Sequence, residues 1–374
     1  MSYRIDDSYK LPDDVIQLLL SSLSSDDPCV RELAVRLVAR RNNPAITSGL
    51  VARLSDASVP TREIAAMGLG LADAAEAIDP LIRTLRDNAE TVRANAAWAL
   101  GRIEAGKALG QLMDLFSDKS AMVREASVAA VGQMDSTRAA STLIRVLRSD
   151  DSPSVRRVAA WALGNLESRD AVDALSASLG GDGDARVREM SAWALGNIES
   201  RSAATALAKA ARGDSDDRVR ETAVWALGNI EDANAVGVLG EIAANDKSTR
   251  VRGTAAWALG QLLDEGGRAP SGLLKLLTDE SADTRMKAAW ALGQIGDSSA
   301  LGAIHAALKV ETNQEVNRAL IRALIKSGER STETLTELID SKDPRVREAA
   351  IRGLAGHSSL NPWPWPWPRP RPFP

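Results

Sequence analysis

The sequence repeats itself at intervals of 30 to 33 residues, and this period constrains the fold more than any other feature. A Val-Arg dipeptide or a close substitute marks eleven repeats, whose first residues are Val30, Thr61, Val92, Val123, Val155, Val187, Val219, Val251, Thr284, Val316 and Val346. A repeat of this length cannot bury its apolar face alone, so several repeats must stack on one another. We therefore expect one elongated core rather than two or three globular domains.

Each repeat carries two helical segments separated by Asp, Ser, Pro or Gly. The first is short and apolar, as in AASTLIRVLRS, and the second begins near Val-Arg, as in DARVREMSAWALGNIES at 184–200. Four prolines stand where a first helical turn tolerates them, at Pro28, Pro60, Pro153 and Pro344. Alternation of period 2 is absent, so strands are not expected. The sequence predicts an all-α protein.

A glycine follows nine positions after the first residue of eight repeats. These glycines are Gly70, Gly101, Gly132, Gly164, Gly196, Gly228, Gly260 and Gly293. We interpret them as helix C-termini that need a positive φ, a conformation that glycine adopts without steric cost.

Four segments, VRANAAWALGRI, VREMSAWALGNI, VRETAVWALGNI and VRGTAAWALGQL, resemble HEAT repeats, and more narrowly the short HEAT-like repeats of phycobilisome lyases. The resemblance extends over about 13–356. It implies an all-α fold, a right-handed α-solenoid of about eleven helix pairs, preceded by an N-terminal extension at 1–12 and followed by a Pro/Trp/Arg-rich tail at 357–374. A fold of this kind hosts many functions, so the resemblance says little about activity.

Composition narrows the functional classes. The formal net charge is −4, whereas nucleic-acid binders usually carry a basic footprint. The single cysteine, Cys29, provides neither an intramolecular disulfide nor a thiolate metal site. No leader-like apolar segment and no run of 18 apolar residues is present. We expect a cytoplasmic protein with no membrane span, no metal and no cofactor.

Tryptophan recurs at one place in the second helix. With the Val of Val-Arg as position 0 and about 100° per residue, positions 0, 4, 7 and 8 form the core face, and position 6 points roughly 150° away from its centre. Position 10 lies about 40° from position 6 and one turn later. The resulting pairs are Trp98 and Arg102, Trp161 and Asn165, Trp193 and Asn197, Trp225 and Asn229, Trp257 and Gln261, and Trp290 and Gln294. Ala129 with Gln133 interrupts the series.

Two interpretations of the Trp series stay open. Each Trp could pack on the next repeat, or the series could line a concave groove that binds a ligand. Arg36, Arg322 and Arg352 replace Trp in end repeats, which favours the groove because packing would be needed throughout. The Trp/Asn pairs also resemble those of importin-alpha, where Asn holds a peptide backbone; this resemblance is limited to Trp161/Asn165, Trp193/Asn197 and Trp225/Asn229.

Acidic residues stand beside the Trp series at position 2, as Glu125, Glu189 and Glu221. A groove of Trp, Asn and Glu suits an extended ligand that carries Arg or Lys, through cation–π and charge-assisted contacts. We therefore predict a partner protein or peptide with an extended Pro-rich or basic segment.

The C-terminal tail has the composition of such a ligand. Residues 361–374 read NPWPWPWPRPRPFP and contain Trp363, Trp365, Trp367, Arg369, Arg371 and Phe373. Alternating proline favours an extended or polyproline II conformation of about 43 Å, at ~3.1 Å per residue. We predict that this segment docks on a Trp-bearing surface, in cis or in trans. The alternative is an independent or appended extension, similar in composition to Trp/Pro/Arg-rich antimicrobial peptides.

Catalysis has little support in the sequence. The two histidines, His305 and His357, stand in unrelated contexts, and we expect His305 to be a partly buried first-helix residue. The abundant Asp and Arg near the turns are expected to pair between repeats as a structural ladder. We therefore predict a non-enzymatic scaffold. A phycobilin lyase-like or chaperone role is one alternative, and a HEAT-like nucleic-acid-binding protein is the other, because Arg157, Lys287 and Arg318 make some second helices basic.

Overall fold

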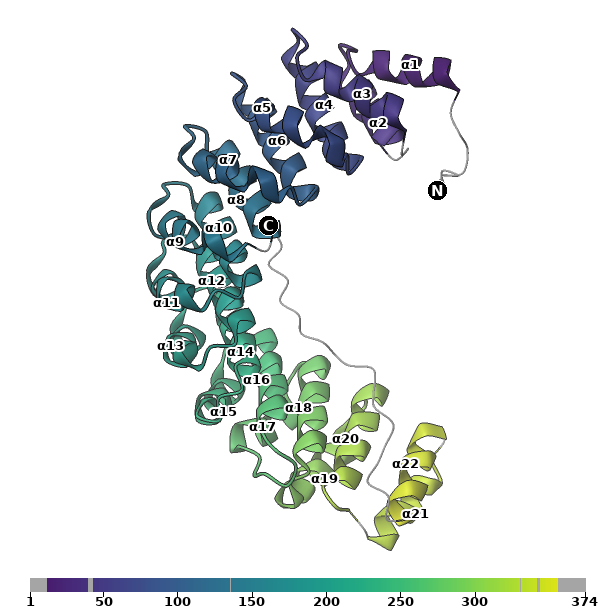
Figure 1. The fold of residues 1–374 in the computed structure, drawn as a ribbon. Helices are drawn as coiled ribbons and strands as arrows, with labels where there is room; N and C mark the ends of the chain where they lie inside the picture. Colours follow the sequence, from purple (N-terminus) through teal and green to yellow (C-terminus); the bar gives the residue numbers. More distant parts are fainter. Residues whose placement is uncertain (1–11, 40–42, 135, 330, 342–343, 356–374) are drawn as a thin grey trace. The chain divides into compact units, whose positions relative to one another are not determined.

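A computed structural model describes residues 12–39, 43–134, 136–329, 331–341 and 344–355. Over these residues the chain forms 22 α-helices and eight short 3₁₀ helices, without any strand (Figure 1). The helices alternate as the first and second helix of eleven repeats. The predicted all-α class and the count of eleven helix pairs are confirmed.

The first helices are short, and many begin or end in a 3₁₀ turn. They are α1 (Asp13–Ser22), α3 (Pro44–Arg53), α5 (Ile78–Thr84), α7 (Leu109–Asp114), α9 (Ala140–Ser149), α11 (Val172–Gly181), α13 (Ala204–Gly213), α15 (Ala235–Asn245), α17 (Ser271–Lys275), α19 (Leu301–Val310) and α21 (Thr332–Ile339). The 3₁₀ helices are Ala75–Ala77, Gly106–Ala108, Leu115–Ser117, Thr137–Ala139, Arg169–Ala171, Arg201–Ala203, Leu276–Thr278 and Ser298–Ala300.

The second helices are longer and begin near Val-Arg. They are α2 (Pro28–Ala39), α4 (Val59–Leu71), α6 (Glu90–Arg102), α8 (Ala121–Gln133), α10 (Pro153–Asn165), α12 (Ala185–Ile198), α14 (Asp217–Asn229), α16 (Thr249–Leu262), α18 (Ala282–Ile295), α20 (Gln314–Lys326) and α22 (Pro344–Leu354). The four predicted prolines occupy first-turn positions of α2, α4, α10 and α22. Asp184 and Asp216 cap α12 and α14 by accepting backbone N–H groups.

The chain divides into two compact parts, residues 12–171 and 172–355 among those described. Within the N-terminal part, α2, α4, α6, α8 and α10 pack in succession, each on the next. Within the C-terminal part, α12, α14, α16, α18, α20 and α22 do the same. Each second helix also packs on the first helix of its own repeat, as Figure 1 shows.

The core follows the predicted helix face. In α6, the residues at positions 0, 4, 7 and 8 are Val92, Ala96, Ala99 and Leu100, and all four are fully buried. Burying one such Leu contributes roughly 1.5–3 kcal/mol, whereas the many alanines contribute mainly by letting helices approach closely. Stability is therefore spread along the array, repeat by repeat.

The expectation for the repeated glycines is wrong. Gly70, Gly132 and Gly196 lie within helices α4, α8 and α12, and none of the eight has a positive φ. The left-handed residue comes three positions later and is usually acidic. These residues are Asp73, Glu104, Glu167, Glu199 and Glu231, with φ between 46° and 52°. The reason for the glycines is instead a close contact between neighbouring second helices, described next.

Candidate functional site

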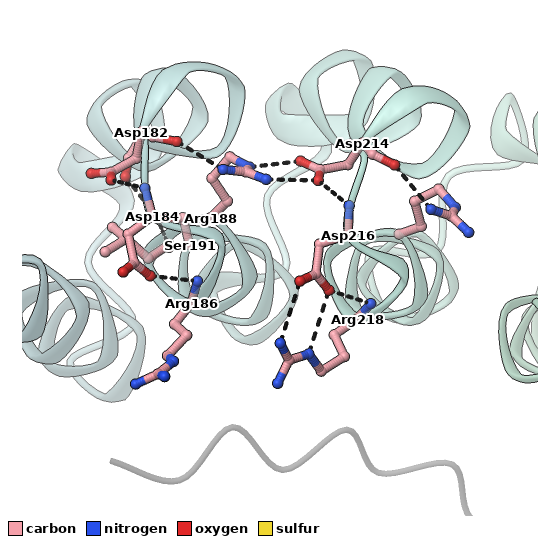
Figure 2. A network of polar contacts seen from close by, with 11 residues as sticks. Asp182, Asp184, Arg186, Arg188, Ser191, Asp214, Asp216 and Arg218 are labelled. Carbon is pink, nitrogen blue, oxygen red and sulfur yellow. Dashed lines mark hydrogen bonds and ion pairs between the residues drawn. The ribbon is translucent and has the colours of Figure 1, made fainter.

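An ion-pair ladder joins successive repeats through the Arg of Val-Arg. Arg188 shows the geometry (Figure 2): its Nε and Nη2 donate to the two carboxylate oxygens of Asp214 at 2.7 and 2.9 Å, and its Nη1 donates to the carbonyl oxygen of Asp182 at 2.9 Å. Equivalent pairs are Arg62–Asp87, Arg93–Asp118, Arg124–Asp150, Arg220–Asp246, Arg252–Asp279 and Arg285–Glu311. The predicted structural ladder is confirmed.

Hydrogen bonds from neighbouring groups keep the carboxylates of the ladder ionised by lowering their pKa values. Burial alone would raise the pKa of the Asp214 carboxyl, but hydrogen bonds from Arg188 and from the backbone N–H of Asp216 outweigh it and lower the pKa. At Asp87, the hydrogen bond from Arg62 is the largest effect and again lowers the pKa. Because each guanidinium and carboxylate in these pairs is already paired and largely buried, the ladder serves to hold repeats together.

The Trp rings lie over the repeated glycines of the preceding repeat. A Cβ atom built on Gly196 would stand 2.7 Å from Cζ3 of Trp225, and one on Gly228 would stand 2.9 Å from Cζ3 of Trp257. The same relationship joins Gly70 to Trp98, Gly132 to Trp161 and Gly260 to Trp290. The glycine is therefore the contact surface on which the next repeat's indole and backbone rest.

Exposure divides the six Trp into two groups. Trp98, Trp161, Trp193 and Trp290 are half-buried, whereas Trp225 is 9% exposed and Trp257 is 2% exposed. The indole N–H of Trp257 is buried and has no hydrogen-bond partner among the described residues. The packing interpretation thus accounts for Trp225 and Trp257, and these two contribute little accessible ring surface.

The carboxamides at position 10 are accessible. Asn165, Gln261 and Gln294 are exposed, and Asn197 and Asn229 are half-buried. Within the described residues none of these five side chains has a hydrogen-bond partner. Each offers one acceptor and two donor hydrogens, so each can satisfy the backbone of an extended ligand.

Arg102 differs from the other position-10 residues because it is held in place. Its guanidinium carbon lies 6.0 Å from the ring centroid of Trp98, a cation–π distance. Its Nε donates to the carbonyl oxygen of Gly70 at 3.1 Å. The side chain therefore stays over Trp98 while its terminal nitrogens are free to donate elsewhere.

Glu189 and Glu221 form an acidic pair on α12 and α14. Glu189 has no hydrogen-bond or ion-pair partner within the described residues, and Glu221 has only long contacts, at 3.5 Å to Oγ1 of Thr254 and 3.6 Å to Nε of Arg250. Burial raises the pKa of both carboxyl groups. Among the charges near Glu189, Arg218 lowers its pKa, whereas Asp216 and Glu221 raise it.

The sequence argument missed the residues around this pair. The charges of Arg250 and Lys287 and the hydrogen bond from Thr254 lower the pKa of Glu221, against the larger effect of burial. Lys287 also pairs with Asp283 at 2.7 Å. A signal was present in the Thr at position 3 of two consecutive repeats, Thr222 and Thr254. The third acidic residue, Glu125, resembles Glu221 in having a distant Arg partner, because Nη2 of Arg157 lies 3.7 Å from its carboxylate.

In the N-terminal part, three position-10 residues come together. A hollow of about 430 Å³ is lined by Gly101, Arg102, Glu104, Gly132, Gln133 and Asn165. These residues stand at or just beyond the C-terminal ends of α6, α8 and α10. Arg102, Gln133 and Asn165 therefore line one hollow, whereas the binding role predicted for position 10 stays a prediction.

The histidine, the end-repeat arginines and the tail were also the subject of predictions. His305 is a half-buried residue of a first helix, α19, as predicted, and its Nε2 lies 2.6 Å from a carboxylate oxygen of Glu329. Arg36 and Arg352 each pair with a Glu on their own helix, Glu32 and Glu348. The tail residues Trp363, Trp365, Trp367, Arg369, Arg371 and Phe373 lie outside the described residues.

The described part of the chain has neither a metal-binding cluster nor a candidate membrane-spanning helix. It contains no group of three or more His, Cys, Asp or Glu side chains placed to hold a metal ion. None of its helices combines the length and the apolar character needed to cross a membrane.

The sequence matches a known protein family along most of its length. The family description "HEAT repeats" matches residues 16–94, 47–130, 84–153, 140–228, 205–271 and 270–355. Curated proteins gave no match.

Two solved structures are similar in fold. One is an engineered protein from the Northeast Structural Genomics Consortium, with 24% identity and a TM-score of 0.51, covering 93% of this chain and 100% of that one. The other comes from a study of how Kap95p binding changes the switch loops of RanGDP, with 13% identity and a TM-score of 0.64. It covers 92% of this chain, which spans only 55% of that longer one.

Proposed function

The chain belongs to the HEAT-repeat family, and from this premise we propose that it is a non-enzymatic scaffold that binds an extended, Pro-rich or cationic peptide. The observation that carries the proposal is a row of polar groups with unmet bonding capacity, repeated from one second helix to the next. Asn197 and Asn229 supply carboxamides, and Glu189 and Glu221 supply carboxylates. The half-buried Trp193 and Trp290 add partly exposed rings.

The spacing of these groups matches a polyproline II ligand. Packed helices lie 8–10 Å apart, and three residues of polyproline II, one full turn, span about 9.3 Å. A ligand in this conformation presents every third side chain on one face. Glu189 and Glu221, one repeat apart, therefore suit basic residues at positions i and i+3.

The charge of the site agrees with a basic ligand. Both carboxyl groups are partly desolvated. Within the described residues Glu189 has no ion-pair partner and Glu221 has only Nε of Arg250 at 3.6 Å, so an incoming guanidinium would gain charge-assisted hydrogen bonds. In the chain's own tail, Arg369 and Arg371 stand at i and i+2. We propose that this tail competes for the same face through its Trp and Pro residues, and that only one of its two Arg meets a carboxylate at a time.

The test uses the full chain and two peptides, Ac-PPRPPRPP-NH2 and the same peptide with citrulline in place of Arg. Citrulline keeps the shape and removes the charge. We expect the Arg peptide to bind at least tenfold more tightly in calorimetric titration. The E189Q/E221Q double variant should lose that preference, whereas the control E241Q/E280Q, which removes two exposed carboxylates outside the second helices, should keep it.

A backbone role for the carboxamides is tested by N197A/N229A. Within the described residues these side chains make no hydrogen bond, so the variant should weaken binding of both peptides by a similar factor with little change of the unfolding midpoint. Trp225→Ala is a poor probe, because the ring is 9% exposed and packs on Gly196. Equal affinity for the Arg and citrulline peptides in the wild-type chain would refute the proposal.

A further inference from the structure

The one interruption of the Trp series coincides with a hollow. At five steps between repeats, a Trp ring covers the glycine of the preceding repeat. At the step from α6 to α8 the residue is Ala129, and a Cβ on Gly101 would lie 2.5 Å from Cα and 2.7 Å from Cβ of Ala130 and 3.2 Å from Oε1 of Gln133. The backbone of α8 thus rests on this glycine as at the other steps, but the third contact is a carboxamide instead of a ring. Among the described residues, no ring atom is one of the three nearest neighbours of a Cβ on Gly101, and this glycine lines the hollow of about 430 Å³.

We infer that this hollow is a binding site for an aromatic side chain, best an indole, supplied by a peptide partner. The ligand's ring would take the place over Gly101 that a Trp ring takes over the equivalent glycine elsewhere. Gln133 reaches into that place with a flexible side chain, which can move aside or lie against the ring.

The lining offers an indole a cation to stack on and acceptors for its N–H. Arg102 is fixed over Trp98 and against the Gly70 carbonyl, so its guanidinium can stack on a second ring at little entropic cost. The side chains of Gln133 and Asn165 and the carboxylate of Glu104 provide acceptors for an indole N–H. A hollow with one positive and one negative side chain favours a neutral ligand group over an ion.

Filling the hollow from within tests the inference. Ala129→Trp recreates the Trp-x-x-x-Gln arrangement that Trp257 and Gln261 already form in α16, so the fold should accept it. The control is Met122→Trp, which adds an indole at a 52% exposed position of the same helix. Far-UV circular dichroism and the thermal midpoint check that each variant is folded.

The probes are N-acetyl-tryptophanamide and N-acetyl-leucinamide, titrated in ligand-observed NMR. We expect saturable binding of the Trp probe to the full chain, at least tenfold weaker binding to A129W, and unchanged binding to M122W. Arg102→Gln should weaken it severalfold, which provides a second variant if A129W does not fold. The Leu probe should bind at least fivefold more weakly.

The chain's own Trp could occupy the hollow, so the titration is repeated with Trp363, Trp365 and Trp367 changed to Ser. Equal binding to wild type and A129W, equal binding of both probes, or no saturable binding in either background would overturn the inference. The result is separate from that for Glu189 and Glu221, because A129W should leave the preference for the Arg peptide intact.

Discussion

Cζ3 of Trp225 lies 2.7 Å from the point that a Cβ atom on Gly196 would occupy, and Cα of Ala226 lies 3.0 Å from it. The ring of one repeat and the backbone of the same helix thus rest together on a surface that has no side chain. Real Cβ atoms do not approach other heavy atoms this closely, so the glycine sets the distance between α12 and α14.

The first prediction is that Gly196→Ala destabilises the chain although alanine is the better helix former. The added methyl must push against both a ring and a backbone, and overpacking of this kind costs about 1–3 kcal/mol. The control is Gly237→Ala in α15, where nothing lies within 4 Å of the new Cβ. That variant should be neutral or gain up to about 0.5–1 kcal/mol.

Urea unfolding followed by circular dichroism measures both variants. A fall of the midpoint for G196A with no fall for G237A is the expected result. If G196A were as stable as the wild type, the second helices would not be in direct contact at this glycine.

The sequence predicted the repeat, the helix pairs and the pairing of Arg with Asp, because each leaves a periodic signal in residue type. It did not predict why Gly196 is glycine. Glycine is required both where φ is positive and where another helix approaches closely. The sequence shows that position 196 is glycine, but it does not show which of the two causes applies. Only the coordinates distinguish them, and they place the positive φ on residues such as Glu199.

The projection of Trp onto a single helix was also incomplete. It placed position 6 away from the core of its own repeat, but the neighbouring repeat covers that side as well. Trp225 and Trp257 are buried for this reason, while the position-10 carboxamides, one turn further on, stay accessible. The hollow at Ala129 follows from the same packing and could not be found before the ring-on-glycine contact was known.

The second prediction concerns the ladder. Arg188 and Asp214 have side chains that are 14% and 8% exposed, and Arg188 also binds the Asp182 carbonyl. Arg188→Gln removes the partner of a buried carboxylate, and we expect a loss of about 3 kcal/mol, the low end for breaking a buried ion pair. The control Lys107→Gln breaks the pair with Asp79, in which both side chains are more than half exposed, so the unfolding midpoint should hardly change.

A double-mutant cycle with Asp214→Asn separates the pair from the rest of the network. If the two single variants and the double variant showed additive losses, Arg188 would stabilise the chain through its carbonyl contact rather than through Asp214.

The third prediction is that two sets of carboxylates change stability with pH in opposite directions. The pKa of Asp214 is lowered in the folded chain, so its contribution is present above its unfolded value of about 3.9 and is lost as pH falls through the folded value. The pKa values of Glu189 and Glu221 are raised, chiefly by burial, so the folded chain binds their protons more readily than the unfolded chain does. These two therefore reduce stability at pH 7, and stability rises as pH falls toward their unfolded value of about 4.3.

The E189Q/E221Q variant should accordingly have a higher urea midpoint than the wild type at pH 7, and the gain should shrink to nothing near pH 4. Asp214→Asn should do the reverse, with its loss greatest at pH 7 and smallest at pH 3. Protonation of Glu189 and Glu221 removes the negative charge that we propose for ligand binding, so the preference for the Arg peptide should weaken as pH falls from 7 toward their unfolded value of about 4.3. A lower midpoint for E189Q/E221Q at pH 7 would mean that the two carboxylates already have stabilising partners in the free chain, and they could not then be kept available for a cationic ligand.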